Sequence, residues 1–264
     1  MYRLEYRKTY RHRHQLFWLV LYVVIAAGSI IYIKTIRVKD ADTQPLNTDN
    51  GEENEKTVRR EVRPVRKVIS VPLISQQDYP TGCESVTSVM ALQFAGYDVS
   101  VDEFIDQYLK TGRYYAKDGQ YYGDSPYSSF IGNPRTGSGF GCFAPVIYEA
   151  LVKAAGENQV KDLTGMPLGE ICKDYIGNGI PVILWATMEM TASYPGRQWT
   201  ILDTGETYTW SAQEHCLLLV GVDDEYYYFN DPRHGEGMTK YEKKVTEERY
   251  GEMGSQALAV LPEQ

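Results

Sequence analysis

An apolar run near the N-terminus constrains this chain more than any other feature of its sequence. The stretch Leu16–Ile33 spans 18 residues and holds no Asp, Glu, Lys or Arg. About 20 mostly apolar residues are enough for a helix to cross a bilayer. Trp18 and Tyr32 lie near the ends of the stretch, where aromatic rings favour the membrane interface. We therefore expect a transmembrane signal-anchor helix over residues 15–36. The alternatives are a signal peptide cleaved near the small residues 26–28 and a buried helix of a soluble domain.

The charges on either side of this run predict how the chain is oriented. Residues 1–14 form a basic tail with five Lys or Arg against one Glu, and basic residues stay on the cytoplasmic side of a membrane. Residues 37–67 are rich in charge, Asn and Asp and show no apolar period, which is typical of a flexible stalk. The sequence thus predicts a single-pass protein of the cell membrane, with its N-terminus in the cytoplasm. The remaining residues, 68–264, form one domain outside the cell, which is secreted if the signal is cleaved.

The composition of this domain excludes several classes of protein. It holds 13 Lys or Arg against 27 Asp or Glu, and such a negative balance argues against a nucleic-acid partner. Four Cys are too few for a disulfide scaffold, although a single disulfide such as Cys142–Cys172 remains an alternative. Neither a C-x-x-C nor an H-x-x-x-H pattern occurs, so we expect no metal site and no cofactor. The oligomeric state is not predicted by any of these features.

The order of the expected elements indicates an α+β domain, with helices first and antiparallel strands later. Apolar residues recur at three- and four-residue spacing after Cys83, and Gly96 follows them as a C-cap. Ser100 and Glu103 form a capping box for the next helix. The Gly-, Tyr- and Pro-rich segment 110–141 is expected to be a long loop. Helices are expected at 83–95, 101–109, 145–156 and 167–176, and strands at 68–74, 181–186, 199–202, 208–210, 215–222, 226–230 and 256–261.

Cys83 is the strongest candidate for a nucleophile. It follows Gly82 and opens the first expected helix, where the partial positive charge and free N–H groups of a helix N-terminus lower the pKa of a thiol. Gln76 and Gln77 lie just upstream, and a side-chain amide together with the N–H of Cys83 can form an oxyanion hole. The alternative is a buried cysteine with a purely structural role.

His215 is the candidate for proton transfer. It begins an apolar strand, and Asp231 follows the next strand 16 residues later. The ends of a hairpin's two strands lie side by side, so the carboxylate of Asp231 can orient the imidazole. Asn230 is adjacent, but neighbouring residues of a strand point to opposite faces, and we expect Asp231 to reach His215. The alternative for His215 is a hydrogen-bonded histidine without a chemical role. His234, in a polar turn, is expected to be solvated.

Four segments of the domain resemble the bacterial C39-like peptidase family, which is itself similar to papain and to bacteriocin leader peptidases. In chain order they are ISQQDYPTGCESV, GFGCFAPVI, HCLLLVGVD and YFNDP. The resemblance implies a papain-like fold, in which the helix of the catalytic cysteine packs on an antiparallel sheet. Leader peptidases belong to transporters, whereas this chain has one expected span and no expected transporter domain. The resemblance therefore implies a hydrolytic site but not the removal of leader peptides.

The resemblance also implies a role for each matching residue. Cys83 corresponds to the nucleophile, His215 to the general base and acid, and Asp231 to the orienting residue. Papain-like spacing assigns the oxyanion amide to Gln77, whereas the Ser-Gln pairing of this subgroup favours Gln76.

We therefore expect a membrane-anchored thiol hydrolase outside the cytoplasm, above all a cysteine peptidase that acts on a peptide or protein. The alternatives are an acyltransferase or amidase that uses the same thiol, and a non-catalytic module that binds a peptide or the cell wall. The tyrosines of segment 110–141 either stack on the substrate or belong to an ordinary surface loop.

Overall fold

The computed structural model describes residues 67–263, which lie within one compact unit of the chain. The expected basic tail (1–14), the expected transmembrane helix (15–36) and all but the last residue of the expected stalk (37–67) lie outside the described residues. Within 67–263, no helix is long and apolar enough to cross a bilayer.

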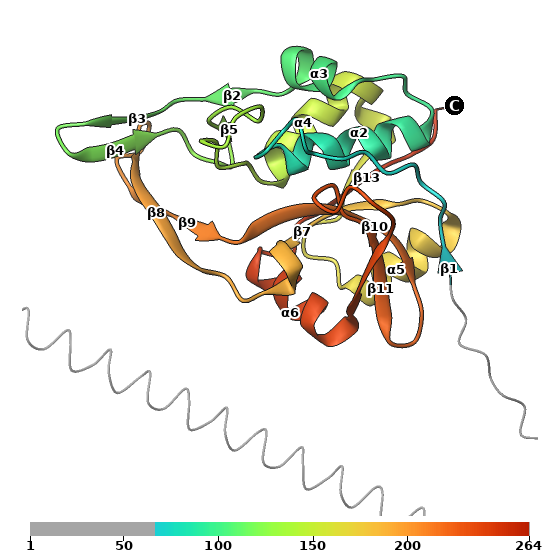
Figure 1. Cartoon of the computed structure of the whole chain (residues 1–264). Coiled ribbons are helices and arrows are strands. Elements are labelled where there is room, and N and C mark those ends of the chain that lie inside the picture. The colour runs from blue at the N-terminus through green and yellow to red at the C-terminus, as the bar shows by residue number, and fades with distance from the viewer. Residues whose placement is uncertain (1–66, 264) are drawn as a thin grey trace, which may run out of the picture. The chain divides into compact units, whose positions relative to one another are not determined.

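Most helices of the domain precede most of its strands (Figure 1). The α-helices are α2 (Cys83–Ala95), α3 (Val101–Glu103), α4 (Ala144–Ala155), α5 (Leu168–Asp174) and α6 (Lys243–Glu252). Short turns of other helix types are η1 (Phe104–Tyr108, a π-helix that continues α3), η2 (Glu157–Gln159), η3 (Ile176–Asn178) and η4 (Met188–Met190). The strands are β1 (Lys67–Val68), β2 (Thr111–Gly112), β3 (Tyr114–Lys117), β4 (Gln120–Gly123), β5 (Phe130–Ile131), β6 (Val160–Asp162), β7 (Val182–Thr187), β8 (Tyr194–Ile201), β9 (Thr207–Ala212), β10 (Glu214–Val222), β11 (Tyr226–Asn230), β12 (Thr239–Glu242) and β13 (Ala257–Val260).

A seven-stranded antiparallel sheet forms the body of the domain. Its strands follow the order β12-β11-β10-β7-β13-β6, and β1 pairs with the end of β10. The residues of β10 alternate between two apolar clusters, with Cys216, Leu218 and Val220 in one and Leu217 and Leu219 in the other. Helices α2 and α4 contribute to the first cluster, and α5 and α6 contribute to the second, on the opposite side of the sheet (Figure 1). Because both faces are covered, β10 is buried along nearly its whole length.

Helix α2 is buried almost all round because it packs against both the sheet and α4. Its bounds are those predicted from the sequence, and Gly96 caps its C-terminus with a φ of 104°. Eleven of its 13 residues are buried. The hydroxyl of Thr87 donates a hydrogen bond of 3.1 Å to the carbonyl of Cys216. This bond fastens the first turns of α2 to β10.

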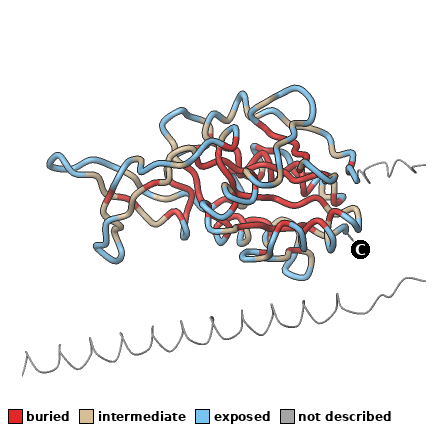
Figure 2. The backbone as a smooth tube through the Cα atoms, turned by 90° about the horizontal axis from the view of Figure 1, so that it is seen from below, coloured by how far each residue is buried: buried red, intermediate tan, exposed pale blue. Residues whose placement is uncertain are grey.

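A second sheet of four strands projects from the body as an arm (Figure 1). Its strands follow the order β3-β4-β8-β9, and β4 pairs with β8 in parallel although the two are distant in sequence. The rings of Tyr114, Phe140 and Trp199 contact one another where the arm meets the body. Figure 2 shows that buried residues concentrate in the body, whereas the arm is largely exposed.

Two predictions for the first half of the domain are wrong. The segment 110–141 is not a plain loop, because it contains β2 to β5. Its β3–β4 hairpin turns at Asp118 and Gly119, both with positive φ, and an Asp-Gly pair is a typical signal for this turn. The strand predicted over 68–74 ends at Val68, although the N–H of Ile69 still donates to Val220. Pro72 has no N–H to add to the ladder.

The structure of the second half of the domain agrees more closely with the prediction from the sequence. The α+β class is confirmed, and the strands predicted over 181–186, 215–222, 226–230 and 256–261 are β7, β10, β11 and β13, each to within one residue at either end. Strands β6 and β12 and helix α6 were not predicted. Helix α6 is mostly charged and buries only Thr246 and Tyr250, so it shows little of the apolar period by which a helix is recognised.

Candidate active site

Cys83 is the first residue of α2, directly after a tight turn. A Cβ atom on Gly82 would lie 3.0 Å from the Cβ of Tyr79 and 3.1 Å from the Cβ of Pro134, so a larger residue would have to displace these neighbours. Only 6% of Cys83 is exposed. The turn therefore directs the thiol into the interface between α2 and β10, and not into solvent.

His215 and Asp231 form a buried hydrogen-bonded pair. His215 lies near the start of β10, and Asp231 follows β11, the antiparallel neighbour of β10. The Nε2 atom of His215 lies 2.7 Å from Oδ1 of Asp231, which also accepts the N–H of Arg233. Burial raises the pKa of Asp231, but these hydrogen bonds bring the net pKa below its ordinary value. Asn230 points elsewhere, since its Nδ2 donates to the carbonyl of Val71.

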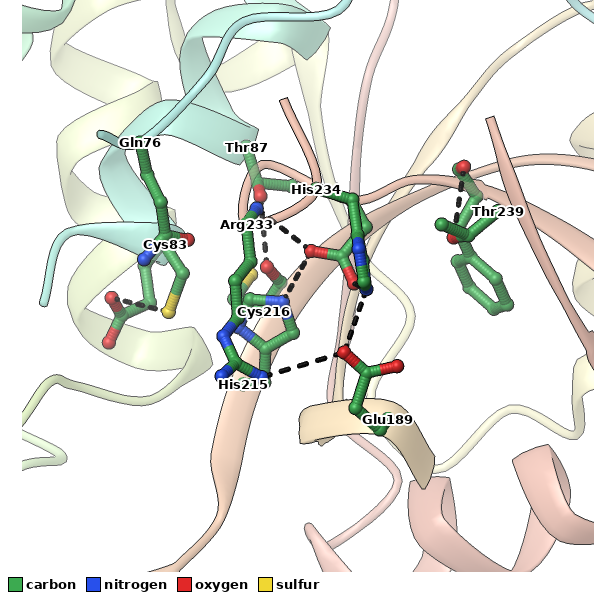
Figure 3. Close-up of polar contacts among 12 residues, drawn as sticks. Gln76, Cys83, Thr87, Glu189, His215, Cys216, Arg233, His234 and Thr239 are labelled. Carbon is green, nitrogen blue, oxygen red and sulfur yellow. Dashed lines mark hydrogen bonds and ion pairs between the residues drawn. The ribbon is translucent and has the colours of Figure 1, made fainter. Parts of the chain in front are cut away.

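Two acids that were not among the predicted site residues lie against the thiol. The Sγ atom of Cys83 donates to Oε2 of Glu84 over 3.3 Å (Figure 3). The other oxygen of Glu84 accepts the N–H of Cys142 over 2.6 Å. Glu214 is also buried, and one atom each of Cys83, Glu84 and Glu214 lie within 4.8 Å of one another. Oε1 of Glu214 is buried and has no hydrogen-bond partner. We call Glu84 and Glu214 the acid pair.

Burial dominates the ionisation of these groups. It raises the pKa of Glu84 from 4.5 to about 7, against a hydrogen bond from the N–H of Cys142. It raises the pKa of Glu214 well above 4.5, and the charge of Glu84 raises it further. Burial and the charges of both acids also raise the pKa of the Cys83 thiol, while the N–H of Cys216 lowers it. Burial and the charges of the two acids therefore oppose the lowering of the Cys83 pKa that was predicted from the helix N-terminus.

The thiol turns toward the acid pair and not toward the imidazole. Among residues 67–263, no hydrogen bond joins Sγ of Cys83 to His215, although Thr87 fastens their two elements together. Cys83, Glu84 and Glu214 are also the residues that would offer ligand atoms to a metal ion. A Cβ on Gly141 would lie 2.5 Å from Oε1 of Glu84 and 3.2 Å from Oε2 of Glu214, so backbone already fills one side of this cluster.

The two upstream glutamines have different environments. Gln77 is exposed, and its backbone N–H donates to Oγ of Ser75. Gln76 is partly buried, and its side chain lies beside Cys83 (Figure 3). Its Nε2 donates to the carbonyl of Pro80 over 3.4 Å, while its Oε1 is buried without a partner. Of the two, Gln76 is therefore the one whose amide approaches the thiol.

The side chains of the remaining cysteines and of His234 have other surroundings, although Nε2 of His234 lies 3.9 Å from Oδ2 of Asp231. Cys142, Cys172 and Cys216 are all free and buried, so the disulfide that was left open is not formed. His234 is not simply solvated, because its Nε2 lies 2.8 Å from Oε1 of Glu189 and 38% of its side chain is exposed. The ion pair of Arg233 with Glu189 lies in the same place (Figure 3).

The acid pair could have been suspected from its place in the sequence. Glu84 directly follows Cys83, and Glu214 directly precedes His215. An acid next to an apolar segment is usually exposed to solvent. For this reason neither residue was predicted to belong to the site.

Comparison with known proteins places these residues in a family context. Residues 68–258 match the sequence model of the Peptidase_C39 like family. The uncharacterized protein YvpB of Bacillus subtilis is 29% identical over 247 residues, which cover 90% of this chain and 96% of YvpB. A crystal structure from Bacillus anthracis, assigned to the C39-like peptidases, is 28% identical with a TM-score of 0.65, and the match covers 75% of this chain and 98% of that one.

Proposed function

Because the chain belongs to the C39-like peptidase family, we propose that it is a cysteine peptidase that cleaves a peptide or protein substrate. In this proposal Cys83 is the nucleophile, His215 transfers protons and Asp231 orients the imidazole. The observation that carries the proposal is the buried hydrogen bond of 2.7 Å between Asp231 and His215. His215 lies on β10, the strand to which Thr87 joins the helix of Cys83. A fully buried carboxylate against a histidine is the arrangement by which triads fix the tautomer of the imidazole.

The proposed reaction is an acyl transfer to sulfur followed by hydrolysis. The S–H bond of Cys83 breaks as His215 takes its proton, Sγ attacks the scissile carbonyl, and the carbonyl electron pair moves to oxygen. The N–H of Cys83 and the amide of Gln76 stabilise this oxyanion. His215 donates a proton to the leaving amine as the C–N bond breaks. It then takes a proton from water, whose oxygen attacks the thioester, and it returns that proton to the displaced sulfur.

We also propose that the domain works outside the cytoplasm on a single-pass anchor. The apolar run over 15–36, the basic residues of 1–14 and the charged stalk over 37–67 support this topology. Protease added to intact cells should then remove the domain, while an epitope fused to the N-terminus remains protected. An epitope lost from the cells at steady state would instead support a cleaved signal and a secreted domain.

Cells that express the wild-type chain or Cys83→Ala provide the main test. The proposal expects a defined set of released peptides from the wild type only, identified by mass spectrometry. Cys172→Ala, another free buried cysteine, is the matched control and should release the same peptides as the wild type. Equal peptide release by Cys83→Ala would refute the peptidase. An acyl group trapped on Cys83 that passes to an added amine faster than to water would indicate an acyltransferase.

A further inference from the structure

The acid pair and the thiol of Cys83 bring three groups that can ligate a metal ion into one buried cluster. Sγ of Cys83 lies 3.3 Å from Oε2 of Glu84, and one ligand atom each of Cys83, Glu84 and Glu214 lie within 4.8 Å of one another. The ligand atoms of a tetrahedral zinc ion lie about 3.3–3.6 Å apart, because Zn–S bonds measure about 2.3 Å and Zn–O bonds about 2.0–2.2 Å. Side-chain movements of about 1 Å are therefore enough for all three atoms to reach one ion.

The carboxyl group of Glu214 lacks a partner within the protein. Only 7% of Glu214 is exposed, and its buried Oε1 atom accepts no hydrogen bond from residues 67–263. No Lys, Arg or His of the same residues forms an ion pair with either member of the acid pair. A buried carboxylate without a hydrogen bond or a counter-ion is costly. Because this side chain lies against Cys83 and Glu84, it indicates that a cation is the partner of the cluster.

The backbone already fixes the orientation of Glu84. The N–H of Cys142 donates to Oε1 of Glu84 over 2.6 Å, while Oε2 accepts the thiol of Cys83. Hydrogen bonds of this kind orient the ligands of metal sites and strengthen the binding of the ion. A Cβ on Gly141 would lie 2.5 Å from Oε1 of Glu84 and 3.2 Å from Oε2 of Glu214, so the backbone of Gly141 packs against both carboxylates.

The kinds of ligand atom favour zinc over the other common divalent cations. Magnesium and calcium take oxygen ligands, whereas zinc binds both thiolates and carboxylates. Burial, and then the charges of both acids, raise the pKa of the free thiols Cys142 and Cys216. These two sulfur atoms therefore lie near the cluster, and surroundings that contain further sulfur also favour zinc.

On these grounds we propose that Cys83, Glu84 and Glu214 form an inhibitory zinc site, in which one Zn²⁺ ion binds the sulfur of the nucleophile. The inference rests on the proposed peptidase function and adds a means of regulating it. When zinc binds, the S–H bond of Cys83 breaks, a Zn–S bond forms, and the proton passes to solvent together with any proton that the acid pair carries. The bound sulfur cannot attack a carbonyl. A chelator that removes the ion returns the sulfur to its protonated, usable form.

Zinc binding to the purified full-length chain tests the site without any peptide substrate. The chain is freed of metal with EDTA, dialysed, and titrated with Zn²⁺ near neutral pH against a chromophoric chelator. We expect the wild type to take up one equivalent of zinc. Glu214→Gln keeps the size of the side chain but loses a charged ligand, and it should bind zinc at least about tenfold more weakly. Glu149→Gln, on the exposed side of α4, is the matched control and should bind zinc as the wild type does. Unchanged binding by Glu214→Gln would overturn the proposal.

Alkylation with iodoacetamide locates the ion on the nucleophile. Quantifying the Cys83 peptide by mass spectrometry separates Cys83 from the other three cysteines. One equivalent of zinc should slow the alkylation of Cys83 in the wild type by about tenfold or more, because the sulfur that binds the metal is the one that attacks the reagent. EDTA should restore the rate, and Mg²⁺ should have no effect. An alkylation rate of Cys83 that zinc leaves unchanged would show that the ion does not bind this sulfur, and the proposal would be wrong.

Cys83→Ala supplies an independent arm if Glu214→Gln does not fold. It removes the sulfur ligand and should also weaken zinc binding at least about tenfold, and an affinity equal to that of the wild type would contradict the site. Failure of the peptidase has a different signature, which is equal peptide release by cells that express Cys83→Ala or the wild type. That result would refute the inhibitory role, whereas the titration with zinc decides independently whether the ion is bound.

Discussion

The pH dependence of stability is a direct consequence of the buried acid pair. Burial raises the pKa of Glu84 from 4.5 to about 7 in the folded chain, while the unfolded chain keeps the ordinary value. Each pKa unit corresponds to about 1.4 kcal/mol, so the protonated carboxyl contributes about 3 kcal/mol to the free energy of unfolding. This contribution is complete below pH 4.5 and decreases as pH rises to about 7, because the unfolded chain ionises first. Above that range it is lost.

Urea unfolding at a series of pH values, compared between the wild type and Glu84→Gln, measures this contribution. Fluorescence of the buried Trp185, Trp199 and Trp210 reports the transition. Between pH 4.5 and 7 the free energy of unfolding of the wild type should fall by about 3 kcal/mol relative to Glu84→Gln. Glu149→Gln, on the exposed side of α4, is the control, and its free energy of unfolding should change with pH as that of the wild type does. A difference between wild type and Glu84→Gln that stays constant over this range would show that the carboxyl does not have a raised pKa, and the reasoning would be wrong.

Single variants separate the roles of the other residues. Gln76→Ala should lower kcat by about 10²–10³-fold, because an oxyanion donor is lost, and Gln77→Ala should cost much less; similar losses would contradict the choice of Gln76. Asp231→Asn should lower kcat by about 10²–10⁴-fold with little change in KM, because the imidazole loses the carboxylate that orients it. Gly141→Ala should lower the free energy of unfolding in urea by about 1–3 kcal/mol, since φ is 147° and the new Cβ would meet an oxygen of the acid pair at 2.5 Å. Gly169→Ala, with no atom within 4 Å of its new Cβ, is the control and should not destabilise.

Local signals explain which parts of the fold were predictable. Both ends of helix α2 were predicted because Gly82 lies directly before its apolar spacing and Gly96 directly after it. The approach of Asp231 to His215 follows from hairpin geometry, since β10 and β11 are consecutive antiparallel strands. Both predictions depend on residues close together in the chain.

The features that were missed depend on contacts between distant residues. The arm needs the parallel pairing of Tyr122 with Thr200. A local sequence pattern does not predict a strand partner that lies so far along the chain. Glu84 obtains its buried surroundings only when Cys142 donates to it and Glu214 is brought beside it. The burial of the thiol is likewise a result of packing, and this burial raises the pKa of Cys83 against the local effect of the helix N-terminus.

The arm is assembled from segments that leave the ribosome at different times. The β3–β4 hairpin ends at Gly123, whereas β8, the parallel partner of β4, begins at Tyr194. At about 5–20 residues per second, synthesis of the roughly 70 residues between them takes about 4–14 s. Throughout this interval the β4 edge, lined with Tyr121 and Tyr122, is open to pairing with other chains. The arm is therefore the part of the domain that is exposed to wrong strand pairing during synthesis. This exposure comes after the central helix α2 has already left the ribosome.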